Sequence, residues 1–209
     1  MVIKCVKMNT KTHGGSDLLE SISNPMTELK QDGAINFETV SLEELIDYIK
    51  RGHHNYLREQ VSMIQHLSEM TLHENHNGYD YLQEIHDLTC SLLDSIMPHL
   101  LKEERIIFPY IEYMEGMINK GKKPKKPPFG NVSSLIIKMH GDHDDASAIL
   151  TKLRTLSDHY TAPSDATQTW CKLYVKLQEL DTDLNAHMHI EDDILFKRAL
   201  AMEASLTDQ

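Results

Sequence analysis

The sequence has few of the residues that build disulfide frameworks or aromatic cores. Its 209 residues include 3 cysteines, 4 phenylalanines and 1 tryptophan. The cysteines, Cys5, Cys90 and Cys171, form no C-x-x-C pair and leave one without a possible mate. This usage is typical of a reducing compartment, and we expect a cytoplasmic protein.

Basic residues and long apolar stretches are also scarce. Lys and Arg number 21 against 32 Asp and Glu, a net charge of −11 that disfavours general attraction to nucleic acid or anionic lipid. No run of about 18 apolar residues is long enough to span a bilayer. The first residues also lack the apolar core of a secretory signal. We therefore expect no nucleic-acid partner and no membrane association.

The residues that are present indicate a folded domain rich in histidine. Apolar residues make up 40% and charged residues 25% of the chain, as in ordinary globular proteins, and the length fits one domain. There are 13 histidines and 11 methionines. The methionines are explained as core filler, whereas histidine in this number suggests a metal site if the spacing is suitable.

The helical periodicity predicts an all-α, up-down-up-down four-helix bundle over residues 41–202. Residues 1–40 are predicted to be a partly ordered N-terminal extension, and residues 203–209 a C-terminal tail. Ser41 and Glu44 form a capping-box pattern that marks the first helix. The four apolar-periodic segments cover approximately residues 41–72, 79–114, 131–158 and 164–202. Between the second and the third, residues 119–130 are rich in lysine and proline and predict a solvated loop, with a docking patch as the alternative.

Two H-x-x-x-E pairs lie on the apolar faces of two different helices. They are His99 with Glu103 and His187 with Glu191, and a spacing of four residues places imidazole and carboxylate on one face of a helix. Each pair offers a terminal nitrogen ligand and a carboxylate that can bridge two metals.

The other two helices supply further histidines. His143 lies on the apolar face of the third helix, and either His53 or His54 lies at the apolar edge of the first. Four His and two Glu suit two iron ions bridged by the two carboxylates and an oxygen, and manganese, which accepts similar oxygen and nitrogen ligands, is the alternative metal. A metal-free, hydrogen-bonded core is the alternative, but it would bury two carboxylates without a cation, which is costly.

Three segments resemble the hemerythrin-like domain of the repair-of-iron-centres di-iron proteins. They are PHLLKEERIIFPYI, GDHDDASAIL and LNAHMHIEDDILFKRAL, at residues 98–111, 141–150 and 184–200. The resemblance covers roughly residues 41–202 and is most specific in H-x-x-x-E-E-x-x-[IL]-F-P and H-x-x-x-E-x-x-I-L-F-x-R-A-L.

The resemblance implies a di-iron centre and assigns six metal ligands. They are His54, His99, Glu103, His143, His187 and Glu191, with His54 taken from the pattern H-x-x-L-R-E. It implies repair or protection of iron–sulfur clusters under nitrosative or oxidative stress, with nitric oxide, dioxygen or peroxide as small ligands and damaged iron–sulfur proteins as partners. Iron donation, ligand binding and reductive turnover all stay open. Members of the family often carry an N-terminal domain with adjacent cysteines, where this chain has only Cys5.

The alternative function is a hemerythrin-like oxygen binder or sensor. Such a site is expected to hold a fifth histidine and a bridging aspartate, for which Asp192 is available. The third helix argues against it, since His140 and His143 form H-x-x-H where oxygen carriers have H-x-x-x-H.

Overall fold

The computed structural model describes residues 36–75, 78–128 and 130–207. Most of the predicted extension over residues 1–40, with Cys5, lies outside the described residues. The boundaries predicted for the extension and for the tail therefore stay predictions.

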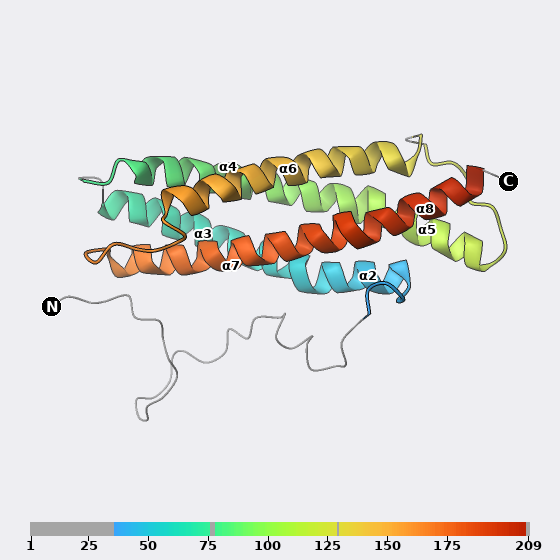
Figure 1. The fold of residues 1–209 in the computed structure, drawn as a ribbon, viewed down its shortest axis with the longest axis horizontal. Helices are drawn as coiled ribbons and strands as arrows, with labels where there is room; N and C mark the ends of the chain where they lie inside the picture. Colours follow the sequence, from blue (N-terminus) through green and yellow to red (C-terminus); the bar gives the residue numbers. More distant parts are fainter. Residues whose placement is uncertain (1–35, 76–77, 129, 208–209) are drawn as a thin grey trace, which may run out of the picture.

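The described chain forms an all-α four-helix bundle, which confirms the predicted fold class (Figure 1). Each arm of the bundle is one long helical rod, and three of the four rods contain a short π-helical segment. The arms are α2 (Leu42–Ile49), η1 (Lys50–His54) and α3 (Asn55–Glu74); α4 (Tyr81–Lys102), η2 (Glu103–Ile107) and α5 (Phe108–Asn119); α6 (Val132–Leu156); and α7 (Gln168–Ile190), η3 (Glu191–Leu195) and α8 (Phe196–Thr207).

Consecutive arms run in opposite directions and close into a ring. Helix α3 packs against both α4 and α7, α4 packs against α6, and α6 packs against α7 and α8. Figure 1 shows all four rods along the long axis of the molecule. Every arm therefore presents one face to a shared interior, which is where bundles build metal sites.

Side-chain caps fix the start of three arms. Ser41 caps α2 and forms the predicted capping box, in which the Glu44 carboxylate accepts from the Ser41 amide. Asn131 caps α6 and Thr167 caps α7 through side-chain oxygens that accept from backbone amides. These polar caps satisfy amides that a helix start leaves without partners.

The buried apolar side chains form two clusters, one towards each end of the bundle. The first is drawn from α3, α4, the later part of α6 and α7, and includes Leu57, Ile64, Leu92, Trp170 and Leu177. The second is drawn from α2, η2, α5, the start of α6, η3 and α8, and includes Leu45, Ile49, Phe108, Ile136 and Phe196. The histidines and glutamates predicted as ligands belong to neither cluster, and all of them except the partly exposed His99 are buried.

The π-helical segments are the feature of the fold that the sequence did not predict. Periodicity indicated continuous helices, but η1, η2 and η3 each interrupt an arm. Segments of this kind are rare and occur mostly at functional sites. The fourth arm also continues as helix to Thr207, beyond residue 202.

Within the described ranges, no helix combines the length and the apolar character needed to cross a lipid bilayer.

Candidate metal centre

The three π-helical segments lie at the level of the predicted metal ligands. His54 is the last residue of η1, Glu103 is the first of η2 and Glu191 is the first of η3. His99 and His187 stand four residues before the two glutamates, on α4 and α7. In both H-x-x-x-E pairs, the carboxylate therefore sits at the junction of α-helical and π-helical backbone.

The six predicted residues come together as two overlapping groups. Both groups contain Glu103 and Glu191; the inner half adds His54 and His187, and the outer half adds His99 and His143. Within each group, one ligand-type atom per residue lies within 4.8 Å of the others. Two four-residue groups that share two carboxylates could hold two cations, with the shared carboxylates as bridging ligands.

The distances between imidazoles fit neighbouring ligands on one cation. The Nε2 atoms of His54 and His187 are 3.2 Å apart, and those of His99 and His143 are 3.1 Å apart. Two ligands about 2.1 Å from a first-row metal and at right angles would be separated by about 3.0 Å. The structure therefore presents paired nitrogen atoms at the spacing that coordination requires.

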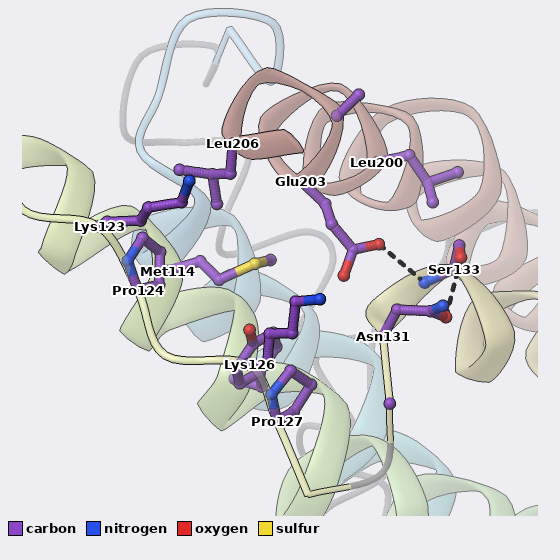
Figure 2. Close-up of a pocket in the computed structure, with 13 residues that line it drawn as sticks. Met114, Lys123, Pro124, Lys126, Pro127, Asn131, Ser133, Leu200, Glu203 and Leu206 are labelled. Atoms are coloured by element: carbon purple, nitrogen blue, oxygen red, sulfur yellow. Dashed lines mark hydrogen bonds between the residues drawn. The ribbon is translucent and has the colours of Figure 1, made fainter. Parts of the chain in front are cut away.

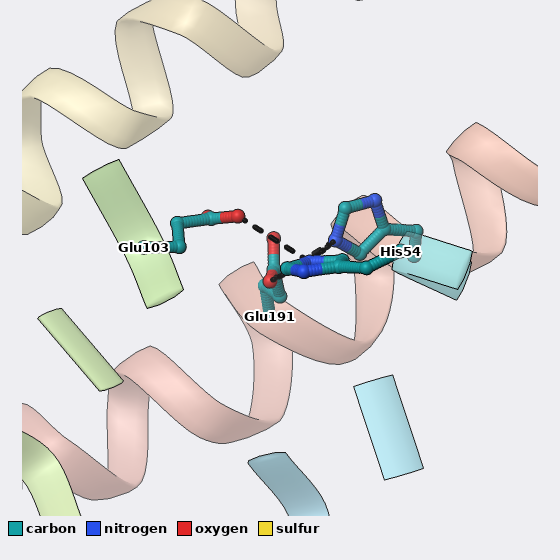
Figure 3. A group of neighbouring side chains, drawn as sticks. His54, Glu103 and Glu191 are labelled. Atoms are coloured by element: carbon teal, nitrogen blue, oxygen red, sulfur yellow. Dashed lines mark hydrogen bonds and ion pairs between the residues drawn. The ribbon is translucent and has the colours of Figure 1, made fainter. Parts of the chain in front are cut away.

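The glutamate oxygens point to the same interior space. Glu103 Oε1 lies 3.1 Å from His99 Nε2, and Glu191 Oε1 lies 3.0 Å from His187 Nε2. Nevertheless, all four carboxylate oxygens are fully buried without a hydrogen bond of acceptable geometry among the described residues. Figure 3 shows Glu103, Glu191 and His54 extending toward one another from three arms. Buried, unsatisfied oxygens beside paired nitrogens are the donor set of a cation site.

Burial creates an electrostatic conflict that a cation would remove. Burial, together with the charge of Glu191, raises the pKa of Glu103. Burial also acts to raise the pKa of Glu191, but the charge of His187 and the close approach of the His143, His187 and His54 imidazoles hold that pKa well below its usual range. Two adjacent carboxylates cannot both ionise at low cost unless positive charge lies between them.

The carboxylates around the centre raise the pKa of three ligand-type imidazoles. Burial acts to lower the pKa of His54, His99 and His143, but the neighbouring carboxylates outweigh burial and raise all three. The pKa of His143 rises to about 10, through Asp192 and Glu191. A metal at this site must therefore displace protons.

A second layer of carboxylates orients three of the histidines. Each accepts from an Nδ1 atom: Glu104 from His54 at 2.7 Å, Asp142 from His99 at 3.2 Å and Asp192 from His143 at 2.9 Å. Such bonds fix the tautomer, so that Nε2 faces the metal, and they raise the basicity of the ligand.

Sequence analysis missed the role of these carboxylates, although the sequence contains a signal. Glu104 follows Glu103, Asp142 precedes His143 and Asp192 follows Glu191. Adjacent residues on a helix point about 100° apart, so the neighbour of an inward ligand faces the next arm of the bundle. The adjacency of acid and ligand could therefore have indicated this layer.

Two positively charged side chains near the surface form ion pairs with two of the second-layer carboxylates. Arg58 contacts Glu104 at 2.7 Å, and Lys102 contacts Asp142 at 2.9 Å. The positive charge helps to lower the pKa of each carboxyl group, although partial burial of both opposes the shift.

The structure distinguishes residues that the sequence left as alternatives. His54 enters the inner half, whereas His53 lies behind His187 and contacts Asp183. Asp192 lies in neither group, and its Oδ1 accepts from both His143 and the half-exposed His140. The structure thus assigns neither Asp192 nor His140 to the positions that an oxygen-carrier site would need.

A pocket of about 220 Å³ leads to the centre between α4 and α6. Its wall includes His99, His143 and His187, whereas His54 is not part of it. Ser95, Lys102 and Asp142 contribute polar groups, and the remaining lining is mostly apolar: Leu57, Ile96, Pro98, Leu100, Ala146, Leu184 and Met188. The pocket reaches the outer half directly and is small enough to select small molecules.

A larger cavity, of about 470 Å³, lies beside the lysine-rich loop and contains none of the six ligand-type residues (Figure 2). Lys123 and Lys126 contribute to its wall. Glu203 accepts from the amides of Val132 and Ser133, so its carboxylate is engaged at the start of α6. Neither of the two ligand-type groups among the described residues includes a residue of this cavity.

The fold and the shared His/Glu groups are those of a helical cation-binding protein. Residues 45–199 match the Hemerythrin HHE cation binding domain, and the chain belongs to this family.

Its curated relatives identify the branch of the family. The chain is 35% identical to the iron-sulfur cluster repair protein YtfE of Musicola paradisiaca, over 81% of this chain and 70% of the relative. It is 29% identical to the iron-sulfur cluster repair protein DnrN of Neisseria gonorrhoeae, over 78% and 95%. It is 26% identical to the iron-sulfur cluster repair protein ScdA of Staphylococcus epidermidis, over 86% and 78%.

Proposed function

We propose that this protein is a non-haem di-iron protein that protects or repairs iron–sulfur clusters under nitrosative or oxidative stress. The single observation that carries the proposal is the pair of four-residue groups sharing Glu103 and Glu191. The relatives named iron-sulfur cluster repair proteins support the biological role.

The donor set favours iron. Four imidazoles and two carboxylates form no thiolate site of the kind that structural zinc prefers, and the imidazole share favours iron over manganese, which is bound mainly through oxygen. We assign His54 and His187 to one iron, His99 and His143 to the other, and Glu103 and Glu191 to both. When bound, the iron pair supplies open coordination positions, redox chemistry and a source of transferable iron.

The chain's own residues prepare and protect this centre. Glu104, Asp142 and Asp192 hold three imidazoles with Nε2 directed inward. The two apolar clusters on either side keep the centre away from bulk water. The pocket gives one guarded route to the outer half, and its size suits nitric oxide, dioxygen or peroxide.

The oxygen-binding alternative receives less support. Asp192 is engaged by His143 and His140 and lies outside both groups, and the relatives carry repair names. The proposal includes a cytoplasmic location, because the three cysteines form no C-x-x-C pair and iron–sulfur proteins work in reducing compartments.

The test is iron content followed by iron transfer. Protein reconstituted anaerobically with ferrous iron should hold two irons per chain, change its visible spectrum with nitric oxide, and restore activity to an iron–sulfur enzyme damaged by nitric oxide. The Glu103→Ala variant is the control, because any activity that it restores comes from iron that is not held by the complete centre. A wild-type chain that stays metal-free, or that restores no more activity than this variant, would contradict the proposal.

A further inference from the structure

The residues of the second layer occupy equivalent positions around the bundle. Glu104, Asp142 and Asp192 each adjoin an inward residue and contact the histidine of a neighbouring arm. His53 adjoins His54 in the same way and faces the fourth histidine, His187. In this position alone, among the described residues that support a ligand-type histidine, an imidazole replaces the carboxylate.

His53 is fully buried and packed against His187. The two rings are stacked with centroids 5.5 Å apart and planes within 11°. On its other side, His53 Nδ1 lies 2.9 Å from Asp183 Oδ1, at a contact buried from solvent. The pair spans η1 and α7, so it joins two arms directly behind the inner half.

Each of the two stacked rings has one buried nitrogen without a hydrogen-bond partner among the described residues. These are His187 Nδ1 and His53 Nε2. His187 directs Nε2 inward, so its Nδ1 carries the proton and is a donor. His53 donates from Nδ1 to Asp183, so its Nε2 is an acceptor. The stacked pair thus contains one unpartnered donor and one unpartnered acceptor, and leaving both unsatisfied would be costly.

The surroundings suit a bridging water. Two hydrogen bonds of about 2.9 Å at a tetrahedral water join nitrogen atoms roughly 4.7 Å apart, and the ring centroids of His53 and His187 are 5.5 Å apart. Asp183 Oδ2, Tyr56 Oη and Gln60 Oε1 are further buried polar atoms without partners among the described residues. Burial, and after it the charges of Glu179 and Asp183, raise the pKa of Tyr56. A buried water is expected to find two to four such partners.

We propose that His53, held by Asp183, is a positioning residue that supports His187 through a buried water. The inference rests on the proposed di-iron function, because it assigns an electronic role to the environment of one ligand. The direct carboxylates of the other three histidines push electron density strongly toward the metal. An imidazole acting through water pushes less than a carboxylate in direct contact, so the inner iron would be held by one weaker and one stronger imidazole donor.

Substitution of His53 separates stacking from hydrogen bonding. His53→Phe keeps an aromatic ring against His187 but removes the acceptor, whereas His53→Gln restores an amide that can donate to Asp183 and accept from water. His140→Phe is the matched control, since His143 keeps its own 2.9 Å bond to Asp192. All variants are measured as full-length, iron-reconstituted chains for iron content, iron affinity and reduction potential.

We expect His53→Phe to weaken binding of one of the two irons by about tenfold and to shift the reduction potential positively. His53→Gln and His140→Phe should resemble the wild type. Asp183→Asn, which preserves the volume of the side chain, should shift the potential in the same direction as His53→Phe but by less.

Equal affinities and potentials in His53→Phe and His140→Phe would overturn the inference. If His53→Phe does not fold, an unchanged potential in Asp183→Asn would overturn it instead. Absence of iron from the wild type is a different result, which contradicts the proposed function itself.

Discussion

The inner and outer halves of the centre use the same ligand types in different surroundings. In the inner half, the side chains of His54 and His187 are 0% and 1% exposed. In the outer half, those of His99 and His143 are 12% and 6% exposed, and both line the pocket. The comparison shows that one donor set can provide a shielded and an accessible position in a single site.

The halves also differ in what lies behind them. Both outer imidazoles donate to carboxylates near the surface, whereas the inner half combines the carboxylate Glu104 with the buried pair of His53 and Asp183. Access and electronic support therefore vary separately. The outer position is the easier to reach and has the stronger donors, so we expect it to exchange ligands rapidly without binding iron weakly.

Removal of a shared glutamate should have the largest effect, because it breaks both halves together. Glu103→Ala or Glu191→Ala is expected to reduce bound iron below two per chain, measured by elemental analysis after reconstitution. Exposed Glu84 on α4 provides the control substitution Glu84→Ala. Unchanged iron content in both shared-glutamate variants would rule out bridging.

Single-histidine variants should separate the halves. His54→Ala is expected to keep about one iron in the outer half, and His99→Ala about one in the inner half. A ferrous chelator should remove the first rapidly and the second slowly, because both histidines of the outer half line the pocket, whereas the inner half contributes His187 but not His54. Equal removal rates would mean that the pocket does not control access.

A change of pH should show the proton cost of filling the centre. The pKa of His143 is raised from 6.5 to about 10, so this imidazole is protonated at neutral pH and competes with iron. Iron affinity should therefore rise up to tenfold per pH unit for each proton displaced, as measured by calorimetry in buffers of different ionisation enthalpy.

The same shift acts in the opposite direction on the metal-free protein. A raised folded-state pKa stabilises the apo-protein fully below pH 6.5, and this contribution is lost as the pH rises through about 10. The melting temperature of the apo-protein should fall across this window, while that of the iron-loaded protein should fall less. Identical profiles would contradict the protonated state of His143.

Neutralising one second-layer carboxylate should affect only the half whose histidine it contacts. Glu104→Gln is expected to weaken the inner position and Asp142→Asn the outer one, each by about tenfold, at the lower end of such effects. Competition with a chelator of known affinity measures the two binding constants. If both variants weakened the same position, the assignment of the two carboxylates would be wrong.

Narrowing the pocket should have the smallest effect, on rate alone. Ser95→Trp places a large ring on an exposed position of the pocket wall and is expected to slow nitric oxide binding several-fold in stopped-flow measurements. Ser91→Trp, one turn earlier on α4 and outside the pocket, is the matched control. Equal rates in the two variants would indicate another route to the iron.

Spacing within single helices predicted the bundle and five of the six ligand-type residues, whereas the choice of His54 over His53 came from the family resemblance. His99 and Glu103, four residues apart, must share a face. Their ligand role itself stays a prediction. The contacts of Glu104, Asp142 and His53 were missed, because each one joins two arms and depends on the rotation of one helix against another.

The π-helical segments explain why that rotation was hidden. Each segment adds a residue to its arm, and one residue corresponds to about 100° of helix rotation. The apolar repeat before η2 is therefore out of phase with the repeat after it, although each repeat looks regular in the sequence. The layer of ligand-type histidines and glutamates therefore separates two regular stretches of bundle whose apolar repeats are out of register. Among the described arms, only α6 passes this layer without a π-helical segment. An engineer who rebuilt this protein from ideal helices could match the apolar core on one side of the His/Glu layer or on the other, but not on both.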